Sequence, residues 1–184
     1  MKRLIFLLML MLFTYSVEHA QGQTSYAENS NGTGKTMKTR LKPLEKMAGV
    51  KVSEVAKNNF KSDFPDADRI EWKRDKVFDQ VTFTDKDHKD KTAYYNYDGT
   101  LVGTTQFTSF SDLPLKAQKE IKIKYGDYNI EYVLLFIANQ ANQTDMVLYD
   151  IQFKSADNYF LGLTKGKQKI VLQVKNEGNI YKFN

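Results

Sequence analysis

The pattern of apolar and polar residues predicts an amphipathic helix that begins soon after residue 51. Apolar side chains recur at spacings of three and four, which places them on one helix face: Val52, Val55, Ala56, Phe60 and Phe64. Ser53 is a suitable N-cap, and Pro65 prevents the helix from continuing. We therefore expect a helix that begins after Ser53 and ends before Pro65.

Four short segments after this helix alternate between apolar and polar residues, the pattern of half-buried strands. The predicted strands cover residues 69–73, 79–84, 92–97 and 100–105. Asp98-Gly99 separates the last two, and this dipeptide indicates a two-residue hairpin in which both positions adopt positive φ.

A second unit of the same kind is predicted from Leu113. Its helical stripe ends at Gly126 and consists of Leu113, Ala117, Ile121 and Tyr125. Ser111 or Asp112 can cap this helix, and Pro114 fits its first turn. Strands are expected over 130–132, 146–153, 170–175 and 180–183, with Glu177-Gly178 in the place of Asp98-Gly99. The segment 159–164 adds a strand that has no counterpart in the first unit.

The fold class that follows is α+β, a tandem repeat of one helix plus an antiparallel sheet of about four strands. The repeats cover about 52–107 and about 111–184. A single copy of this size buries only a thin core, so we expect the two copies to pack together. Trp72 and most Phe and Tyr residues fall at inward-facing positions and are expected in that core.

The N-terminus has the features of a secretory signal peptide. Lys2 and Arg3 precede an apolar run over residues 4–13, and small residues follow at Ala20 and Gly22. The run is too short to span a bilayer, which takes roughly 20 residues. We expect a signal peptide over 1–22, with cleavage after Ala20 as an alternative, no later transmembrane segment, and a periplasmic or secreted protein.

Charge is concentrated just after this segment. Residues 23–51 carry six basic and two acidic side chains, whereas residues 52–184 carry nineteen of each. We interpret 23–51 as a polar basic linker. A nucleic-acid-binding protein would carry its basic stripe on the folded domain, so no nucleic-acid partner is expected.

Few residues are suited to catalysis or to binding a metal. The chain has no cysteine, which excludes disulfides, thiolate ligands and a lipid anchor on cysteine. His88 is the only histidine after the signal peptide, in a run of alternating aspartates and lysines over 85–91. Three lysines neutralise three aspartates there, so a solvated hairpin tip is favoured over a cation site. We predict no catalytic residue, no metal and no cofactor. A hydrolase that uses paired carboxylates, such as Asp66 with Asp68 or Asp145 with Asp150, is the enzymatic alternative.

The run from Val52 to Tyr128 resembles the PepSY-like family, also described as β-lactamase-inhibitor-like proteins. The resemblance is carried by residues 60–65 (FKSDFP), 70–72 (IEW), 95–99 (YNYDG) and 112–114 (DLP), in that order and spacing. It implies small secreted or periplasmic modules of a helix plus an antiparallel sheet, used singly or in tandem, without catalysis. No inhibitory loop motif can be matched residue by residue, so no inhibitor site is carried over.

The sheet face opposite the helices is the predicted interaction face. Its candidate residues are Arg69, Glu71, Gln80, Thr82, Tyr94 and Asn96, with Glu131 and Val133 in the second copy. The loop 138–145, rich in Asn and Gln, is a second candidate. The function that we expect is an exported, non-enzymatic binding module for a protein or peptide, with an inhibitor-like role included. The alternative is a structural envelope or matrix component, held at anionic surfaces by the basic linker. The sequence does not determine the oligomeric state.

Overall fold

The computed structural model describes residues 41–183, and these form one eight-stranded antiparallel sheet with two α-helices. The sheet order is β1-β2-β3-β4-β5-β8-β9-β10, and β6 and β7 form a separate hairpin. The helices are α2 (Glu54–Asp63) and α3 (Leu115–Lys124), with a short 3-10 helix η1 (Phe110–Asp112) before α3. The strands are β1 (Asp68–Arg74), β2 (Asp79–Thr84), β3 (Asp90–Tyr95), β4 (Leu101–Thr108), β5 (Asn129–Ala138), β6 (Met146–Leu148), β7 (Ile151–Phe153), β8 (Asn158–Lys165), β9 (Gln168–Lys175) and β10 (Ile180–Lys182).

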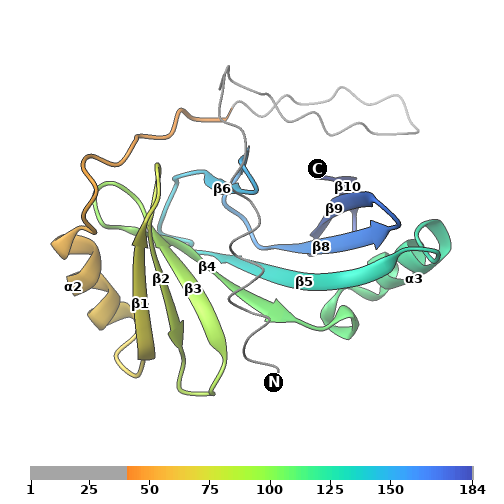
Figure 1. The fold of residues 1–184 in the computed structure, drawn as a ribbon, viewed down its shortest axis with the longest axis horizontal. Coiled ribbons are helices and arrows are strands. Elements are labelled where there is room, and N and C mark those ends of the chain that lie inside the picture. Colours follow the sequence, from red (N-terminus) through yellow and green to blue (C-terminus); the bar gives the residue numbers. More distant parts are fainter. Residues whose placement is uncertain (1–40, 184) are drawn as a thin grey trace.

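The predicted α+β class is confirmed, with an antiparallel sheet and both expected helices. Figure 1 shows a curved sheet with α2 and α3 on its outer side and the β6–β7 hairpin on its inner side. We call the inner side the concave face. The predicted signal peptide, residues 1–22, and linker residues 23–40 lie outside the described residues.

The first helix forms as its sequence predicts. The Ser53 hydroxyl accepts a hydrogen bond from the Val55 amide at 3.2 Å and caps the N-terminus of α2. Ala56 and Phe60 are buried against Val81 and Phe83 of β2. The apolar stripe of α2 therefore covers the outer face of β1–β4.

The start of the second helix differs from the prediction. Neither Ser111 nor Asp112 caps α3. Pro114 occupies the N-cap position without a side-chain bond, and the Asp112 carboxylate instead accepts the Ser109 amide at 2.9 Å. Asp112 therefore caps the start of η1, one turn before α3, because its carboxylate lies too far from the first amides of α3. Ala117 and Ile121 still face the sheet, packed with Val133, Leu161 and the other outward-facing residues of β5, β8 and β9.

Both predicted hairpin turns form, but with another geometry. In each turn only the glycine has a positive φ: +82° at Gly99 and +81° at Gly178. The Gly99 amide donates to the Asn96 carbonyl, and the Gly178 amide donates to the Lys175 carbonyl. Each turn is therefore a four-residue turn closed by glycine, rather than the predicted two-residue turn.

The segment 146–153 is not the single strand that its alternation predicts. Tyr149 and Asp150 both have positive φ, +53° and +62°, and they turn the chain back so that β6 pairs with β7. The extra predicted strand, 159–164, is instead β8, which pairs with both β5 and β9 in the main sheet. The turn was missed because its two central positions hold no glycine or asparagine.

The β6–β7 hairpin builds a third core on the concave face. Met146, Leu148 and Phe153 pack with Phe136 and Phe160 of the sheet. Phe78, Tyr94 and Val102 join the same cluster from the other end of the sheet. The two halves of the sheet therefore share one interior, and it lies under the hairpin.

The chain before α2 lies along this body. The Lys42 amide donates to Asp145 at 2.8 Å, the Met47 amide donates to the Lys76 carbonyl, and Arg74 donates to the Ala48 carbonyl. Residues 41–51, the end of the predicted linker, are thus hydrogen-bonded to both the hairpin and the β1–β2 turn.

Candidate binding face and amide pocket

Three of the eight predicted interaction residues lie together on the open part of the concave face. Glu71 is opposite Thr82 in the β1–β2 register, and Gln80 is two residues before Thr82 on the same strand. Thr82 Oγ1 lies 3.2 Å from Thr92 Oγ1 on β3. Because alternate residues of a strand share a face, this region presents threonine, glutamine and glutamate to solvent.

Tyr94 and Asn96 are buried, so the prediction that they present a surface is wrong. Tyr94 is on the predicted face, but its ring packs against Phe78 and its hydroxyl lies 3.1 Å from Thr105 Oγ1. Asn96 follows the end of β3, where its side chain accepts from the Thr100 amide and donates to Thr144. The loop and hairpin between β5 and β8 cover both residues, and no local sequence pattern indicates this cover.

Val133 lies on the opposite side of the sheet from the prediction. It is buried in the core under α3. A register shift between Ile130 and Tyr132 inserts an extra residue into β5, and this bulge reverses the parity after it. Glu131, inside the bulge, is exposed and accepts a hydrogen bond from Thr164 Oγ1 at 2.9 Å.

Arg69 is exposed at the far edge of the sheet. It has φ +52°, at the irregularity between Asp68 and Glu71, and its guanidinium lies 3.6 Å from the Asp90 carboxylate. The structure therefore places it in a surface ion pair at the end of β1, away from β5.

An aromatic cluster that the sequence did not single out lies next to the open threonines. The Phe107 and Tyr132 rings are in edge contact at 6.1 Å, and Tyr149 lies 6.2 Å from Tyr132. Phe107 is 56% exposed and Tyr149 is 39% exposed, although both are large aromatic residues. We call Phe107, Tyr132 and Tyr149 the aromatic patch.

Tyr149 is held in this patch by the turn of the β6–β7 hairpin. Its positive φ is uncommon for a bulky residue and costs roughly 1–3 kcal/mol when the structure holds it there. Partial burial raises the pKa of the Tyr149 phenol, and the hydroxyl of Tyr132 adds to this effect. The phenol therefore stays protonated and can donate a hydrogen bond at physiological pH.

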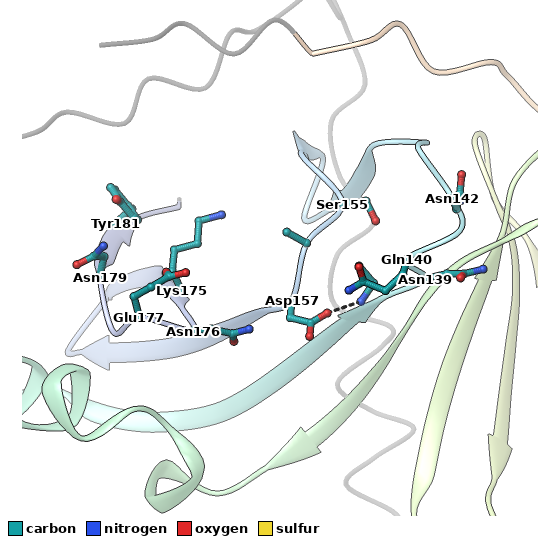
Figure 2. Close-up of a pocket in the computed structure, with 12 residues that line it drawn as sticks. Asn139, Gln140, Asn142, Ser155, Asp157, Lys175, Asn176, Glu177, Asn179 and Tyr181 are labelled. Atoms are coloured by element: carbon teal, nitrogen blue, oxygen red, sulfur yellow. Dashed lines mark hydrogen bonds between the residues drawn. The ribbon is translucent and has the colours of Figure 1, made fainter. Parts of the chain in front are cut away.

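The second predicted candidate, the loop 138–145, forms one wall of a pocket. The cavity has a volume of about 600 Å³ and lies between this loop, residues 155–157 and the β9–β10 turn. Figure 2 shows Lys175, Glu177 and Tyr181 on one side of the pocket, and Gln140 and Ser155 on the other. Five of the twelve residues that line it are Asn or Gln, so we call it the amide pocket.

The run of alternating aspartates and lysines over 85–91 forms the hairpin tip between β2 and β3. Asp85 accepts the Asp87 and Lys89 amides at 2.9 Å and pairs with Lys91 at 2.8 Å. The hydrogen bond from Lys91 lowers the pKa of Asp85, and the Lys89 amide adds to this effect. Within residues 41–183, no group of three or more Asp, Glu or His side chains is placed to hold a metal ion.

The chain matches no protein-family profile and no curated protein in sequence. Its backbone does match solved structures. A BLIP-like protein from Bacteroides fragilis is 14% identical with a TM-score of 0.56, over 73% of this chain and 87% of that one. The chain has the BLIP-like fold.

Other solved structures share this BLIP-like fold. A DUF2874 family protein from Bacteroides ovatus is 15% identical with a TM-score of 0.56, over 73% of this chain and 89% of that one. A candidate periplasmic protein from Bacteroides eggerthii is 13% identical with a TM-score of 0.57, over 71% and 86% of the two chains. In the described part of this BLIP-like chain, neither helix has the length and hydropathy that crossing a membrane requires.

Proposed function

We propose that this protein is an exported, non-enzymatic binding module that recognises a protein or peptide through its aromatic patch. The observation that carries the proposal is the exposure of Phe107 and Tyr149 beside a polar rim of threonine and glutamate. Exposed aromatic side chains within a polar rim are typical of the centre of a protein interface. Tyr149 supports this interpretation because its backbone is strained, and strained backbone conformations are concentrated at functional sites.

The tandem repeat belongs to the same proposal. Each half consists of one helix followed by four strands of the main sheet, and in each the glycine of the last hairpin rests on the N-terminal turn of its helix. We infer a duplicated module whose two concave halves became one face. An inhibitor-like role, in which this face covers part of another protein, fits that shape.

The test is a binding experiment in two steps. Protein of residues 23–184 is used to capture partners from envelope and culture fractions, and the partner, identified by mass spectrometry, is then titrated in purified form. Phe107→Ala and Tyr149→Ala should each weaken that binding at least tenfold, as interface hot spots do. Ile123→Ala is the matched control, because Ile123 is 83% exposed on α3, on the other side of the sheet, and should not change the affinity.

Two results would refute this role for the aromatic patch. One is the absence of any saturable partner in both fractions. The other is a partner whose affinity is equal for wild type and Phe107→Ala. Circular dichroism of each variant establishes that the fold is retained.

Export to the periplasm or the medium is part of the proposal. It rests on the N-terminal pattern of residues 1–22 and agrees with the description of one structural neighbour as a candidate periplasmic protein. Cell fractionation with N-terminal sequencing of the mature chain tests it, and a chain that retains Met1 in the cytoplasm would contradict it.

A second candidate function, attachment to anionic surfaces, is favoured by lysines on the folded body as well as in the linker. Four lie on α3 and three in or beside the β8–β9 turn: Lys116, Lys119, Lys122, Lys124, Lys165, Lys167 and Lys169. The Lys165–Asp127 ion pair joins the β8–β9 turn to the end of α3. This end of the protein is therefore positively charged, whereas α2 carries acidic and basic residues in equal number.

Salt separates the two candidates. Cosedimentation with vesicles containing anionic lipid should disappear at high salt if charge drives it, because the screening length falls from about 10 Å at 0.1 M to 3 Å at 1 M. A deletion of residues 23–40 tests the linker and leaves the hydrogen-bonded residues 41–51 in place, and Lys119→Glu with Lys122→Glu tests the body. Binding through the aromatic patch should survive both changes.

A further inference from the structure

The side of α3 that is turned away from the sheet carries two exposed aliphatic side chains. Ala117 and Ile121 are buried against the sheet, and Leu115, Lys119 and Ile123 follow the opposite side of the helix at a spacing of four residues. Leu115 is 73% exposed and Ile123 is 83% exposed, so neither gains much from folding. We call Leu115, Lys119 and Ile123 the α3 stripe.

The other helix has polar residues at the positions that match this stripe. Both helices have ten residues, and each buries two side chains four residues apart, Ala56 with Phe60 in α2 and Ala117 with Ile121 in α3. Counted from the buried pair, the matching positions in α2 hold Glu54, Asn58 and Ser62, and all three are exposed. A single exposed aliphatic residue is ordinary on a protein surface. Two on one stripe, where the matching helix is polar, indicate a surface with a partner.

Lysines surround the α3 stripe. Ile123 lies in an open depression of the surface, and the other residues that line it are Lys116, Lys119, Glu120 and Lys124. In all, α3 carries four lysines and one glutamate, and Glu120 is paired with Lys124 at 2.8 Å. The two aliphatic side chains therefore lie among positive charges that exceed the negative ones.

This combination of groups identifies the class of partner. A soluble polyanion binds the lysines and gains nothing from the aliphatic side chains. An anionic phospholipid bilayer offers both phosphate headgroups for lysines and an apolar interior just below them. Leu115 and Ile123 are eight residues apart, about 12 Å along the helix axis, and point to the same side. Both can therefore enter a bilayer when α3 lies parallel to its surface.

We propose that α3 docks on an anionic phospholipid bilayer, with Leu115 and Ile123 inserted between headgroups and acyl chains and the lysines bound to headgroup phosphates. The inference rests on the second candidate function, attachment to anionic surfaces, and names the bilayer as that surface. Figure 1 shows α3 on the outer side of the sheet and the β6–β7 hairpin on the inner side. The docked protein therefore turns its concave face, with the aromatic patch, away from the membrane.

The first test is cosedimentation of the protein of residues 23–184 with vesicles of phosphatidylcholine, with and without phosphatidylglycerol. We expect binding only to the anionic vesicles, because the lysines need negatively charged headgroups. Leu115→Gln with Ile123→Gln should weaken this binding about tenfold or more, since it removes two aliphatic side chains from the bilayer and leaves the charge unchanged. Val50→Gln with Ile70→Gln, which changes two exposed aliphatic residues of the α2 half, is the matched control and should bind as wild type does.

Fluorescence shows whether residue 123 enters the bilayer. In Ile123→Trp, the emission of the added indole should move to shorter wavelength with anionic vesicles and be quenched by lipids brominated on their acyl chains, because its surroundings become apolar. Trp72, the only tryptophan of the sequence, packs against Phe60 and provides a constant background. Ser62→Trp places an indole at the matching position of α2 and should show neither change.

The outcomes separate this inference from the function on which it rests. No binding to anionic vesicles at low salt would overturn both. If Leu115→Gln with Ile123→Gln binds as wild type does, attachment to anionic surfaces stands and the insertion is overturned. An emission of Ile123→Trp that is unchanged by bound vesicles would have the same meaning. Tighter binding to dextran sulfate, a soluble polyanion, than to the vesicles would make the partner an anionic polysaccharide. Circular dichroism of each variant establishes that the fold is retained.

Discussion

The α2 half and the α3 half of the sheet follow the same order of elements and differ at one connection. In the α2 half, residues 75–78 join β1 to β2 directly. In the α3 half, residues 139–157 separate β5 from β8 and contain the β6–β7 hairpin. The connection in the α3 half contributes Tyr149 to the aromatic patch and two walls of the amide pocket. The comparison indicates that the helix and four strands of each half provide the scaffold, and that the one long connection carries the candidate binding surfaces.

The largest expected effect comes from removing the side chain that anchors this hairpin. The Phe153 ring lies 5.5 Å from Phe136, 5.1 Å from Phe160 and 5.7 Å from Phe183, centroid to centroid. Phe153→Ala should lower the free energy of unfolding by about 3–5 kcal/mol, the usual cost of emptying a buried aromatic site. Urea denaturation measures it.

Phe60→Ala in the α2 half is the matched comparison, since Phe60 is buried among Phe64, Trp72 and Phe83. If the third core is as well packed as the core under α2, the two losses should be similar. A loss below about 1.5 kcal/mol for Phe153→Ala alone would mean that the hairpin is a loosely attached loop.

A buried carboxylate in each half gives the next comparison. Asp79 accepts two bonds from Arg74 at 2.7 Å and one from the Ser53 amide at 2.9 Å. Asp145 accepts the Lys42 amide at 2.8 Å and pairs with Lys154 at 3.0 Å. The Arg74 side chain is only 12% exposed, whereas that of Lys154 is 37% exposed.

Asp79→Asn should therefore cost about 3 kcal/mol, because it leaves a buried guanidinium unpaired. Asp145→Asn should cost about 1 kcal/mol, because Lys154 can turn to water. Thermal unfolding ranks the two. Hydrogen exchange at the Lys42 amide should accelerate only in Asp145→Asn. The same acceleration in Asp79→Asn would mean that contacts with β1 and β2 hold residues 41–51 in place.

The scaffold could be predicted from the sequence because local signals agree with tertiary packing there. Two elements illustrate this. The cap at Ser53 and the apolar stripe around Phe60 specify α2, the alternation over 79–84 specifies β2, and each element buries the expected face. Gly99 and Gly178 indicated the two equivalent hairpins. They did not indicate the type of turn, because a four-residue turn closed by glycine and a two-residue turn have the same sequence signal.

The candidate binding surfaces could be predicted only in part. The bulge in β5 has no glycine to mark it, so the parity that placed Val133 on the concave face was wrong. The hairpin turn at Tyr149 and Asp150 holds neither glycine nor asparagine, so the alternation over 146–153 predicted a continuous strand. Positive φ at such residues depends on tertiary packing, which local sequence does not encode. The loop 138–145, rich in Asn and Gln, was a candidate from the sequence because it differs between the two copies and joins two strands.

The two glycine turns test how closely the halves correspond. A Cβ at Gly99 would lie 2.7 Å from Val55 Cγ1 and 3.1 Å from the Ala56 nitrogen, whereas one at Gly178 would lie 3.0 Å from Lys116 Cβ and 3.3 Å from the Ala117 nitrogen. Both positions have positive φ, which costs a non-glycine residue about 1–2 kcal/mol. Gly99→Ala should therefore destabilise by about 2 kcal/mol and Gly178→Ala by about 1 kcal/mol, as measured by chemical denaturation. The reverse order would contradict the closer approach of α2 to its hairpin.

The smallest effect is expected where the halves use different residues for the same backbone shape. The β2–β3 turn has His88 at φ +59°, and the β8–β9 turn has Gly166 at φ +58°. His88→Gly should stabilise by up to about 1 kcal/mol, and Gly166→Ala should destabilise by a similar amount, since a Cβ there meets only open space and adds strain alone.

Acid should separate the two turns further. Asp85 holds the β2–β3 turn, and its pKa is lowered by Lys91 and by the Lys89 amide. Its contribution is therefore complete above the ordinary aspartate value, about 3.9, and is lost as pH falls through the lowered pKa. The β8–β9 turn, residues 165–168, contains no carboxylate of its own. Local hydrogen exchange should thus rise on acidification in residues 85–89 before residues 165–168, and simultaneous loss would mean that the two turns are held by the sheet and not by their own side chains.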